Sequence, residues 1–236
     1  MCANYTPTRR ERLEAQAGTT APFDWKPESF PGYQAPILRL EDPPSADEMD
    51  GRCRELNLAS FGMIPPWAKD LKIGRGTYNA RTETVAKKPS FRNAWKKRQF
   101  CVVPMESFFE PLYNGESKPV RWKIEHADGL PLAAAGLWEW RPHGGQEGVG
   151  LFSFTILTIN ADSHPVLNAF HAPHDEKRTI VLLEPHEIGE WLNTSHDEAH
   201  QYIKTLEPEA FKVSAAPLQP RTRKKTTSIE DKPSLF

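Results

Sequence analysis

The chain has 236 residues, of which 38% are hydrophobic, 10% aromatic and 26% charged, a composition that excludes a disordered or fibrous protein. Thirty basic and 31 acidic side chains nearly cancel, so the overall charge does not decide whether the partner is a polyanion, and any basic surface must be local. Three cysteines without a CxxC pair indicate reduced thiols. Because the start CANYTPTRRERLE is polar and no apolar run reaches membrane-spanning length, we expect a cytoplasmic protein that does not enter a membrane.

The sequence predicts more strands than helices. A first helix is expected over residues 8–18, with Thr8 as its N-cap and Gly18 as its stop signal. The later helices are expected at 90–98, with Ser90 as cap, and then at 162–170, 185–193 and 196–205. Strands are apolar runs bounded by turn residues, at 36–40, 53–68 (ending in a Pro-Pro break), 100–110, 120–125, 132–140, 151–159 and 178–183.

Many antiparallel-looking strands with few intervening helices predict the α+β class. We expect a single domain over residues 1–217, with a curved, mostly antiparallel sheet or barrel-like core and peripheral helices. Residues 218–236 have little to bury and include the basic run RTRKK, so we expect a disordered tail. The segment 41–51 is rich in turn residues and predicts a hairpin connection.

Cys2 directly follows the initiator methionine, at a position where chain ends usually fray. Removal of Met1 would leave an α-amine and a thiol on adjacent carbons, with ordinary pKa values of about 7.7–8.0 and about 8.5. Both groups then have a nucleophilic fraction at neutral pH. The amine condenses with an aldehyde to an imine, and the thiol closes onto that carbon to give a thiazolidine. The alternative is a small second residue that serves only efficient methionine removal.

The stretch YNARTET, residues 78–84, contains three polar side chains at strand spacing. In a strand Asn79, Arg81 and Glu83 project to one face. Arg81 could bind a phosphate through two donors, and Asn79 could hydrogen-bond an amine or an oxyanion. The alternative is a solvated edge strand.

Glu110 ends the apolar and aromatic stretch CVVPMESFFEP. A carboxyl beside Phe108 and Phe109 is a candidate for a pKa raised by desolvation, which is what a general acid or base requires. The alternative is a carboxylate that only caps a strand end. Cys101 in the same strand is predicted to be an inert core thiol.

His171 and His174 lie in a predicted loop between a short helix and a strand. Loop histidines at a sheet end can shuttle protons. Together with His164 they could also be three metal ligands. A second histidine-rich stretch, HDEAH, would put His196 and His200 on one helix face. Neither stretch fits the HExxH pattern, and no cysteine lies nearby in the sequence. We therefore predict no metal and no cofactor.

Taken together, these segments resemble the SOS-response-associated peptidase (SRAP) family of abasic-site processing proteins. The family pattern is a cysteine immediately after methionine, then WG-x-IP-x-W, NAR-x-E, a VP…GFYEW-type strand, a GLWE strand and a late histidine before an apolar strand. The corresponding segments here are MC (1–2), FGMIPPW (61–67), NARTE (79–83), VPMESFFEP (103–111), GLWEW (136–140) and FHAPHDEKRTIVLL (170–183). Their order and spacing match over nearly the whole chain up to about residue 217.

The resemblance implies covalent capture of abasic sites in single-stranded DNA, in which Cys2 traps the ring-opened sugar aldehyde as a thiazolidine crosslink. By correspondence with the family, Asn79 orients the terminal amine and Glu110 is the acid/base for the proton transfers. His171 assists sugar ring opening and reversal of the crosslink. The resemblance also implies an abasic-site lyase activity, through β-elimination from the imine, and autoproteolytic removal of Met1, from which the peptidase name derives.

The resemblance further implies a DNA-binding surface, in which Arg81 binds a phosphate and Trp67 stacks or wedges beside the bases. The family usually reads MCGRF, where the arginine faces DNA, whereas Asn4 occupies that position here. We expect Asn4 at the DNA surface with the phosphate contact weakened, and a basic residue of 87–98, such as Lys88, to compensate. The histidine segment is longer than the common HDRMP, so His174 with Asp175 also fits the alignment beside His171.

Two other functions remain open from the sequence. One is an N-terminal-nucleophile thiol peptidase or amidohydrolase that uses Cys2 against an amide. The other is a non-catalytic module that binds single-stranded DNA. The basic segments KDLKIGRG and FRNAWKKR flank NARTE and favour a groove lined with phosphate-binding side chains. We therefore expect a monomer whose partner is single-stranded DNA containing abasic sites.

Overall fold

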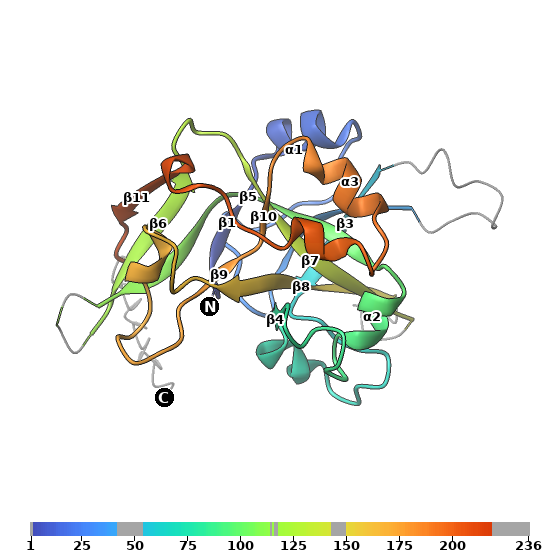
Figure 1. The fold of residues 1–236 in the computed structure, drawn as a ribbon. Coiled ribbons are helices and arrows are strands. Elements are labelled where there is room, and N and C mark those ends of the chain that lie inside the picture. Colours follow the sequence, from blue (N-terminus) through green and yellow to red (C-terminus); the bar gives the residue numbers. More distant parts are fainter. Residues whose placement is uncertain (1, 42–53, 114, 116–117, 143–149, 219–236) are drawn as a thin grey trace, which may run out of the picture.

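The computed structural model describes residues 2–41, 54–113, 115, 118–142 and 150–218. Most of the regular structure is strand (Figure 1). The strands are β1 (Tyr5–Pro7), β2 (Gln34–Leu40), β3 (Arg54–Phe61), β4 (Asn79–Arg81), β5 (Phe100–Leu112), β6 (Val120–His126), β7 (Leu132–Arg141), β8 (Leu151–Asn160), β9 (Arg178–Ile180), β10 (Leu182–Leu183) and β11 (Phe211–Ala215). The helices are α1 (Arg10–Ala17), α2 (Arg92–Lys96) and α3 (Glu187–Asn193), with 3-10 turns η1 (Leu71–Gly76), η3 (Leu167–Ala169), η4 (Ala199–Tyr202) and η5 (Pro208–Ala210).

Five strands close into a barrel. Strand β5 pairs with β7, β7 with β8, β8 with β3, β3 with β2, and β2 again with β5. Strands β6 and β11 extend the sheet outward from β5. Among the described strands, pairing is antiparallel except where β3 and β4 run parallel to β8. The predicted fold, a curved and mostly antiparallel sheet with a barrel-like core, is therefore confirmed.

Both faces of β2, β5, β7 and β8 are largely buried, which explains why these strands read as nearly continuous apolar runs, whereas β3 is only partly buried. Alternate residues of β7 belong to two different clusters: Ala134 and Trp138 to one, Ala135 and Leu137 to the other. The first cluster takes residues from all five barrel strands and includes Cys2, so it fills the barrel. The second contains the apolar faces of the three helices, so it covers the outside of the barrel.

Two predicted helix caps are wrong. Helix α1 begins after Arg9, and Thr8 is buried with its backbone N–H donated to Pro104 O at 3.2 Å. Thr8 therefore continues the β1–β5 contact instead of capping the helix. Helix α2 likewise has Phe91 as its N-cap residue. The predicted stop at Gly18 is confirmed, because Gly18 has φ 72° and donates its N–H to Glu14 O at 2.9 Å.

Other elements differ from prediction where partners distant in sequence decide the structure. The strand predicted over 178–183 is divided: β9 pairs with β8, whereas β10 pairs with β7. The helices predicted at 162–170 and 196–205 are reduced to the short turns η3 and η4. Strands β1 and β11, which the sequence does not predict, pair with β5 and β6. The connection at 42–51 and the tail from 219 lie outside the described residues.

A close contact between two glycines fixes the segment that follows β3. Gly62 has φ 118°, and a Cβ there would lie 2.0 Å from the Gly74 carbonyl oxygen, so only glycine fits. Thr77 donates its hydroxyl to Met63 O at 2.6 Å. The segment carrying Trp67 is therefore held against the end of the barrel. No helix in the described part of the chain is long and apolar enough to cross a membrane.

Candidate functional site

Three segments meet at the end of β5. Glu110 lies two residues before the end of this strand. The N-terminal segment runs beside it, with the Phe109 N–H donated to Asn4 O at 3.0 Å. The loop after η3 returns on the same strand, with the His171 N–H donated to Pro111 O at 2.8 Å. The start of the chain and the histidine loop therefore both contact β5 within one residue of Glu110.

Cys2 is held inside the protein. Its side chain belongs to the barrel cluster and the residue is 1% exposed. Asn79, at the start of β4, donates Nδ2 to the Cys2 carbonyl oxygen at 2.7 Å. The other amide atom, Asn79 Oδ1, is buried and has no hydrogen-bond partner among the described residues. Asn79 therefore fixes the Cys2 backbone through Nδ2, and its Oδ1 can still accept a hydrogen bond.

The proton on His171 can be placed from its neighbours. Nε2 lies 2.9 Å from the Arg178 carbonyl oxygen and 3.5 Å from Glu110 Oε2. Because a carbonyl oxygen only accepts, Nε2 carries a proton, and in the neutral imidazole Nδ1 is then the acceptor. His171 has φ 69°, a left-handed conformation that is costly outside glycine and clusters at functional sites.

Burial shifts all three ionisable groups of this site away from their charged forms. Glu110 is 3% exposed, and burial raises its pKa to about 7. Burial lowers the pKa of His171 to about 4. Burial, with the charge of Glu110 as a second cause, raises the pKa of the Cys2 thiol well above its ordinary range. Neutral forms are favoured because the low-dielectric interior solvates charge poorly.

Arg81 lies two residues after Asn79 in β4, and its side chain is about half exposed. Its Nη1 lies 2.9 Å from Glu176 Oε2, and the other oxygen of Glu176 lies 2.5 Å from Arg178 Nη1. Arg178 is buried and also pairs with Glu83 at 2.9 Å. Two arginines and two glutamates thus form one network. Glu83, expected on the face of Asn79 and Arg81, follows the end of β4, in a turn.

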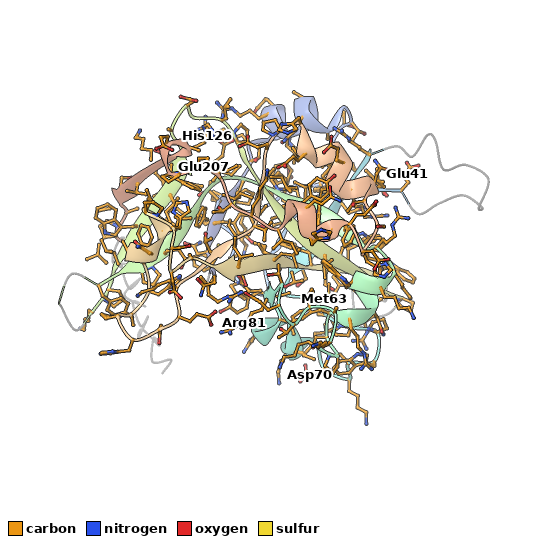
Figure 2. The ribbon with its side chains drawn as sticks, in the orientation of Figure 1. Glu41, Met63, Asp70, Arg81, His126 and Glu207 are labelled. Carbon is orange, nitrogen blue, oxygen red and sulfur yellow. The ribbon has the colours of Figure 1, made fainter. Side chains whose placement is uncertain are left out.

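The other predicted DNA-binding residues differ in exposure: Trp67 and Lys88 are exposed, whereas Asn4 is buried. Trp67 is 53% exposed, and Lys88 is exposed in the turn before α2. Arg81 and Asp70 lie on the same side of the molecule, below β8 in the view of Figure 2. Asn4 is buried, and its side chain contacts Ser29, Glu28 and Arg121.

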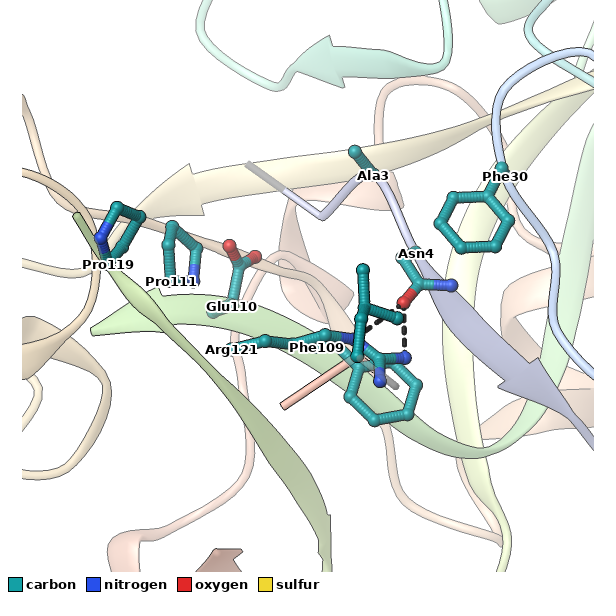
Figure 3. Close-up of a pocket in the computed structure, with 9 residues that line it drawn as sticks. Ala3, Asn4, Phe30, Phe109, Glu110, Pro111, Pro119 and Arg121 are labelled. Atoms are coloured by element: carbon teal, nitrogen blue, oxygen red, sulfur yellow. Dashed lines mark hydrogen bonds between the residues drawn. The ribbon is translucent and has the colours of Figure 1, made fainter. Parts of the chain in front are cut away.

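Sequence reasoning missed Arg121, which lies on β6 opposite Pro111 of β5. Its Nε donates to Asn4 Oδ1 at 3.0 Å, and its Nη2 lies 3.0 Å from Glu28 Oε2. These partners are separated by 93 and 117 positions, so no local pattern could reveal them. Arg121 lines a pocket of about 340 Å³ that also touches Glu110 (Figure 3).

The described residues contain no group of three or more histidine, cysteine, aspartate or glutamate side chains that could hold a metal ion. His171 uses Nε2 toward a carbonyl oxygen, and His164 accepts N–H groups of Val166 and Leu167 on Nδ1. The three-histidine alternative considered from the sequence is therefore not assembled in this part of the structure.

The fold and this site define a class of protein: a small barrel with a buried second-residue cysteine, beside a buried carboxyl and a neutral histidine. The sequence matches the family described as SOS response associated peptidase (SRAP) over residues 1–223. The chain therefore belongs to the SRAP family.

Known relatives agree with this membership. The chain is 32% identical over 180 residues to the abasic site processing protein YoaM of Bacillus subtilis, covering 73% of this chain and 74% of that protein. It is 25% identical to the abasic site processing protein HMCES of Xenopus tropicalis, covering 68% of this chain and 52% of that protein. A crystal structure of a Bordetella bronchiseptica protein superimposes with a TM-score of 0.79 at 29% identity, covering 92% of this chain and all of that one.

Proposed function

We propose that this protein processes abasic sites in single-stranded DNA by forming a covalent crosslink through Cys2 after Met1 is removed. The observation that carries the proposal is the placement of a carboxyl with a pKa of about 7, Glu110, beside the segment that begins at Cys2. An aminothiol reacts with aldehydes, and a ring-opened abasic sugar exposes one. The names of the relatives, which are abasic site processing proteins, support this substrate.

The first step joins the freed α-amine of Cys2 to the sugar aldehyde. Nitrogen attacks the carbonyl carbon to give a carbinolamine, and the protonated Glu110 gives its proton to the departing hydroxyl. Water leaves, and an iminium with a Glu110 carboxylate remains. Asn79 already holds the Cys2 carbonyl oxygen, so its free Oδ1 is the acceptor we assign to the new amine.

The second step closes the ring. Because burial raises the pKa of the Cys2 thiol, the thiol needs a base to become nucleophilic. The Glu110 carboxylate takes the thiol proton, sulfur bonds to the iminium carbon, and the C=N electron pair moves to nitrogen. One aldehyde and one aminothiol thus give one thiazolidine and one water, and Glu110 returns to its acid form.

His171 serves the steps before and after capture. Its neutral imidazole has Nε2–H engaged by the Arg178 carbonyl oxygen, which leaves Nδ1 as the basic atom. We assign Nδ1 to take the sugar hydroxyl proton as the carbonyl forms and to return it to the ring oxygen as the bond from that oxygen to the same carbon breaks, and to act in reversal of the crosslink. Strand cleavage by β-elimination from the iminium, and self-removal of Met1, belong to the same proposal.

The DNA strand itself is held by exposed side chains. Arg81 and Lys88 are assigned to phosphates and Trp67 to a base. Arg81 is half exposed and two residues from Asn79, a position that suits the phosphate nearest the trapped sugar. Asn4 is buried against Arg121, so we assign it to the support of Arg121 and not to a phosphate.

The decisive experiment mixes Met1-processed protein with a single-stranded oligonucleotide that contains one abasic site. We expect an adduct that survives denaturing electrophoresis and adds the mass of the oligonucleotide less one water. Cys2→Ala should form none, whereas Cys101→Ala, which alters the other buried thiol, should still form it. Glu110→Gln should slow adduct formation by about 100-fold or more, the usual effect of losing a general acid/base.

Folding of each variant is checked by circular dichroism and thermal unfolding. A wild-type protein that forms no adduct, with its amino terminus verified as Cys2 by intact mass, would overturn the proposed function. Reversible binding that is unchanged in Cys2→Ala, with no covalent species, would instead identify a single-strand-binding module. Cleavage of amide substrates by the same terminus would favour the amidohydrolase alternative.

A further inference from the structure

The pocket beside Glu110 has no part in the chemistry described above. It has a volume of about 340 Å³ and lies between the N-terminal segment, the β5–β6 pair and Phe30. Ala3 and Glu110 line it, so it opens directly beside the atoms assigned to the reaction. A pocket of this size is at the lower end of those that bind small organic groups.

The walls of the pocket are mainly flat and apolar. Phe30, Phe109, Pro111, Pro119 and Leu218 line it, and among the described residues that line it Arg121 is the one cation. The Arg121 guanidinium carbon lies 3.3 Å from the centroid of the Phe109 ring, so the cation lies over the face of this ring. Figure 3 shows the guanidinium above this ring and directed toward Asn4.

Each of the three guanidinium nitrogens of Arg121 already donates a hydrogen bond within the protein. Nε donates to Asn4 Oδ1 at 3.0 Å, Nη2 to Glu28 Oε2 at 3.0 Å, and Nη1 to Ala216 O at 3.2 Å. A phosphate is bound by in-plane guanidinium donors, and here these donors and the compensating charge of Glu28 belong to the protein. Arg121 is therefore rigid and presents a planar cationic surface suited to stacking.

We propose that this pocket binds the nucleobase of the nucleotide next to the abasic site, stacked beside Arg121. The inference rests on the proposed function. When the sugar is bonded to Cys2, the adjoining nucleotide must lie close to Ala3 and Glu110, and the pocket begins there. Stacking tolerates every base because each has a π-face, so the pocket contributes affinity and register without reading the sequence.

The test changes the DNA while keeping every phosphate. Oligonucleotides carry one tetrahydrofuran residue, an abasic analogue without an aldehyde, flanked either by adenines or, on one side at a time, by a second tetrahydrofuran. Dissociation constants are measured by fluorescence anisotropy at fixed salt. We expect removal of the base on one side to weaken binding by about five-fold or more, the usual contribution of a stacked base.

Protein variants locate the base. In Arg121→Ala the penalty for removing that base should largely disappear, because the partner of the base is gone. Arg121→Lys keeps the charge and loses the planar surface, so its penalty should also fall. In Trp67→Ala the penalty should remain, since Trp67 does not line the pocket. A 2-aminopurine at the same flanking position should be quenched on binding to the wild type and less quenched with Arg121→Ala.

The possible failures can be told apart. If the wild-type protein binds none of the tetrahydrofuran oligonucleotides and also forms no adduct with an aldehyde-bearing abasic site, the proposed function fails and this inference fails with it. If it forms the adduct but binds none of them, only this inference is overturned. If it binds them equally with and without either flanking base, only this inference is overturned. Equal weakening of both oligonucleotides by Arg121→Ala also overturns it, because Arg121 then acts through a phosphate contact or through its support of Asn4 and not through a base.

Discussion

At the level of single residues, the site inverts the usual order of two pKa values, those of a glutamate and a histidine. A glutamate normally loses its proton at a lower pH than a histidine does. Here burial raises the pKa of Glu110 to about 7 and lowers that of His171 to about 4. Between these values the carboxyl holds the proton and the imidazole does not. Pairs of titratable groups pushed apart in this way are how active sites assign acid and base roles.

This inversion predicts the pH dependence of crosslinking. Above pH 7 Glu110 loses the proton that expels water, and below the pKa of the α-amine, about 7.7–8.0, the protonated amine cannot attack the aldehyde. The single-turnover rate of adduct formation should therefore pass through a maximum just above pH 7. In Glu110→Gln the maximum should vanish and leave a slow, steady rise as the α-amine deprotonates near pH 7.7–8.0.

The control for this profile is Glu106→Gln, which removes a carboxylate from the same strand where it pairs with Arg12 at the surface. Its profile should match that of the wild type. A Glu110→Gln variant that keeps a maximum near pH 7 would assign that titration to another group.

At the scale of the element, the sequence predicts β5 and the barrel strands well because burial on both faces leaves a strong apolar signal. It also predicts Asn79 as a candidate from the polar spacing of YNARTET, and Glu110 and His171 because each follows a recognisable apolar stretch. It cannot predict that Asn4 contacts Arg121 across 117 positions, because that contact depends on how β5 and β6 pair. Elements such as β1, three residues long, exist only through their partners.

The glycine contact after β3 predicts a local, measurable dependence. Gly62→Ala places a Cβ 2.0 Å from the Gly74 carbonyl oxygen at a φ of 118°, which costs about 1–3 kcal/mol from the backbone alone. Its free energy of unfolding, measured with urea, should fall by at least that amount. Gly76→Ala is the matched control, since its added Cβ meets nothing within 4 Å. Equal stability of the two variants would contradict the role given to this contact.

At the scale of the whole molecule, the near balance of 30 basic and 31 acidic side chains means that DNA affinity depends on local charge. The network of Arg81, Glu176, Arg178 and Glu83 is nearly neutral as a whole. A DNA phosphate that binds Arg81 must compete with the carboxylate of Glu176, which lies 2.9 Å from it. If Arg81 binds a DNA phosphate as proposed, Glu176 limits how tightly the DNA strand is held.

Replacing this carboxylate should strengthen binding. We expect Glu176→Gln to lower the dissociation constant for single-stranded DNA by up to about five-fold, because an exposed ion pair contributes about 1 kcal/mol at most. Glu125→Gln makes the same change of charge on β6, where Glu125 pairs with Lys123, and should have a smaller effect. Anisotropy titrations at several salt concentrations measure both. Unchanged or weaker binding by Glu176→Gln would remove Arg81 from the phosphate contacts.

The pairing of β1 with β5, together with the burial of Cys2, has a consequence for when the protein becomes reactive. A chain end is ordinarily the most mobile part of a protein, yet here folding itself immobilises the backbone on which the amine and thiol stand. On the proposed mechanism the untrimmed chain lacks the aminothiol, since the nitrogen of Cys2 is still in a peptide bond. Removal of Met1 creates the aminothiol and folding places it beside Glu110, so catalysed capture of an aldehyde requires both events.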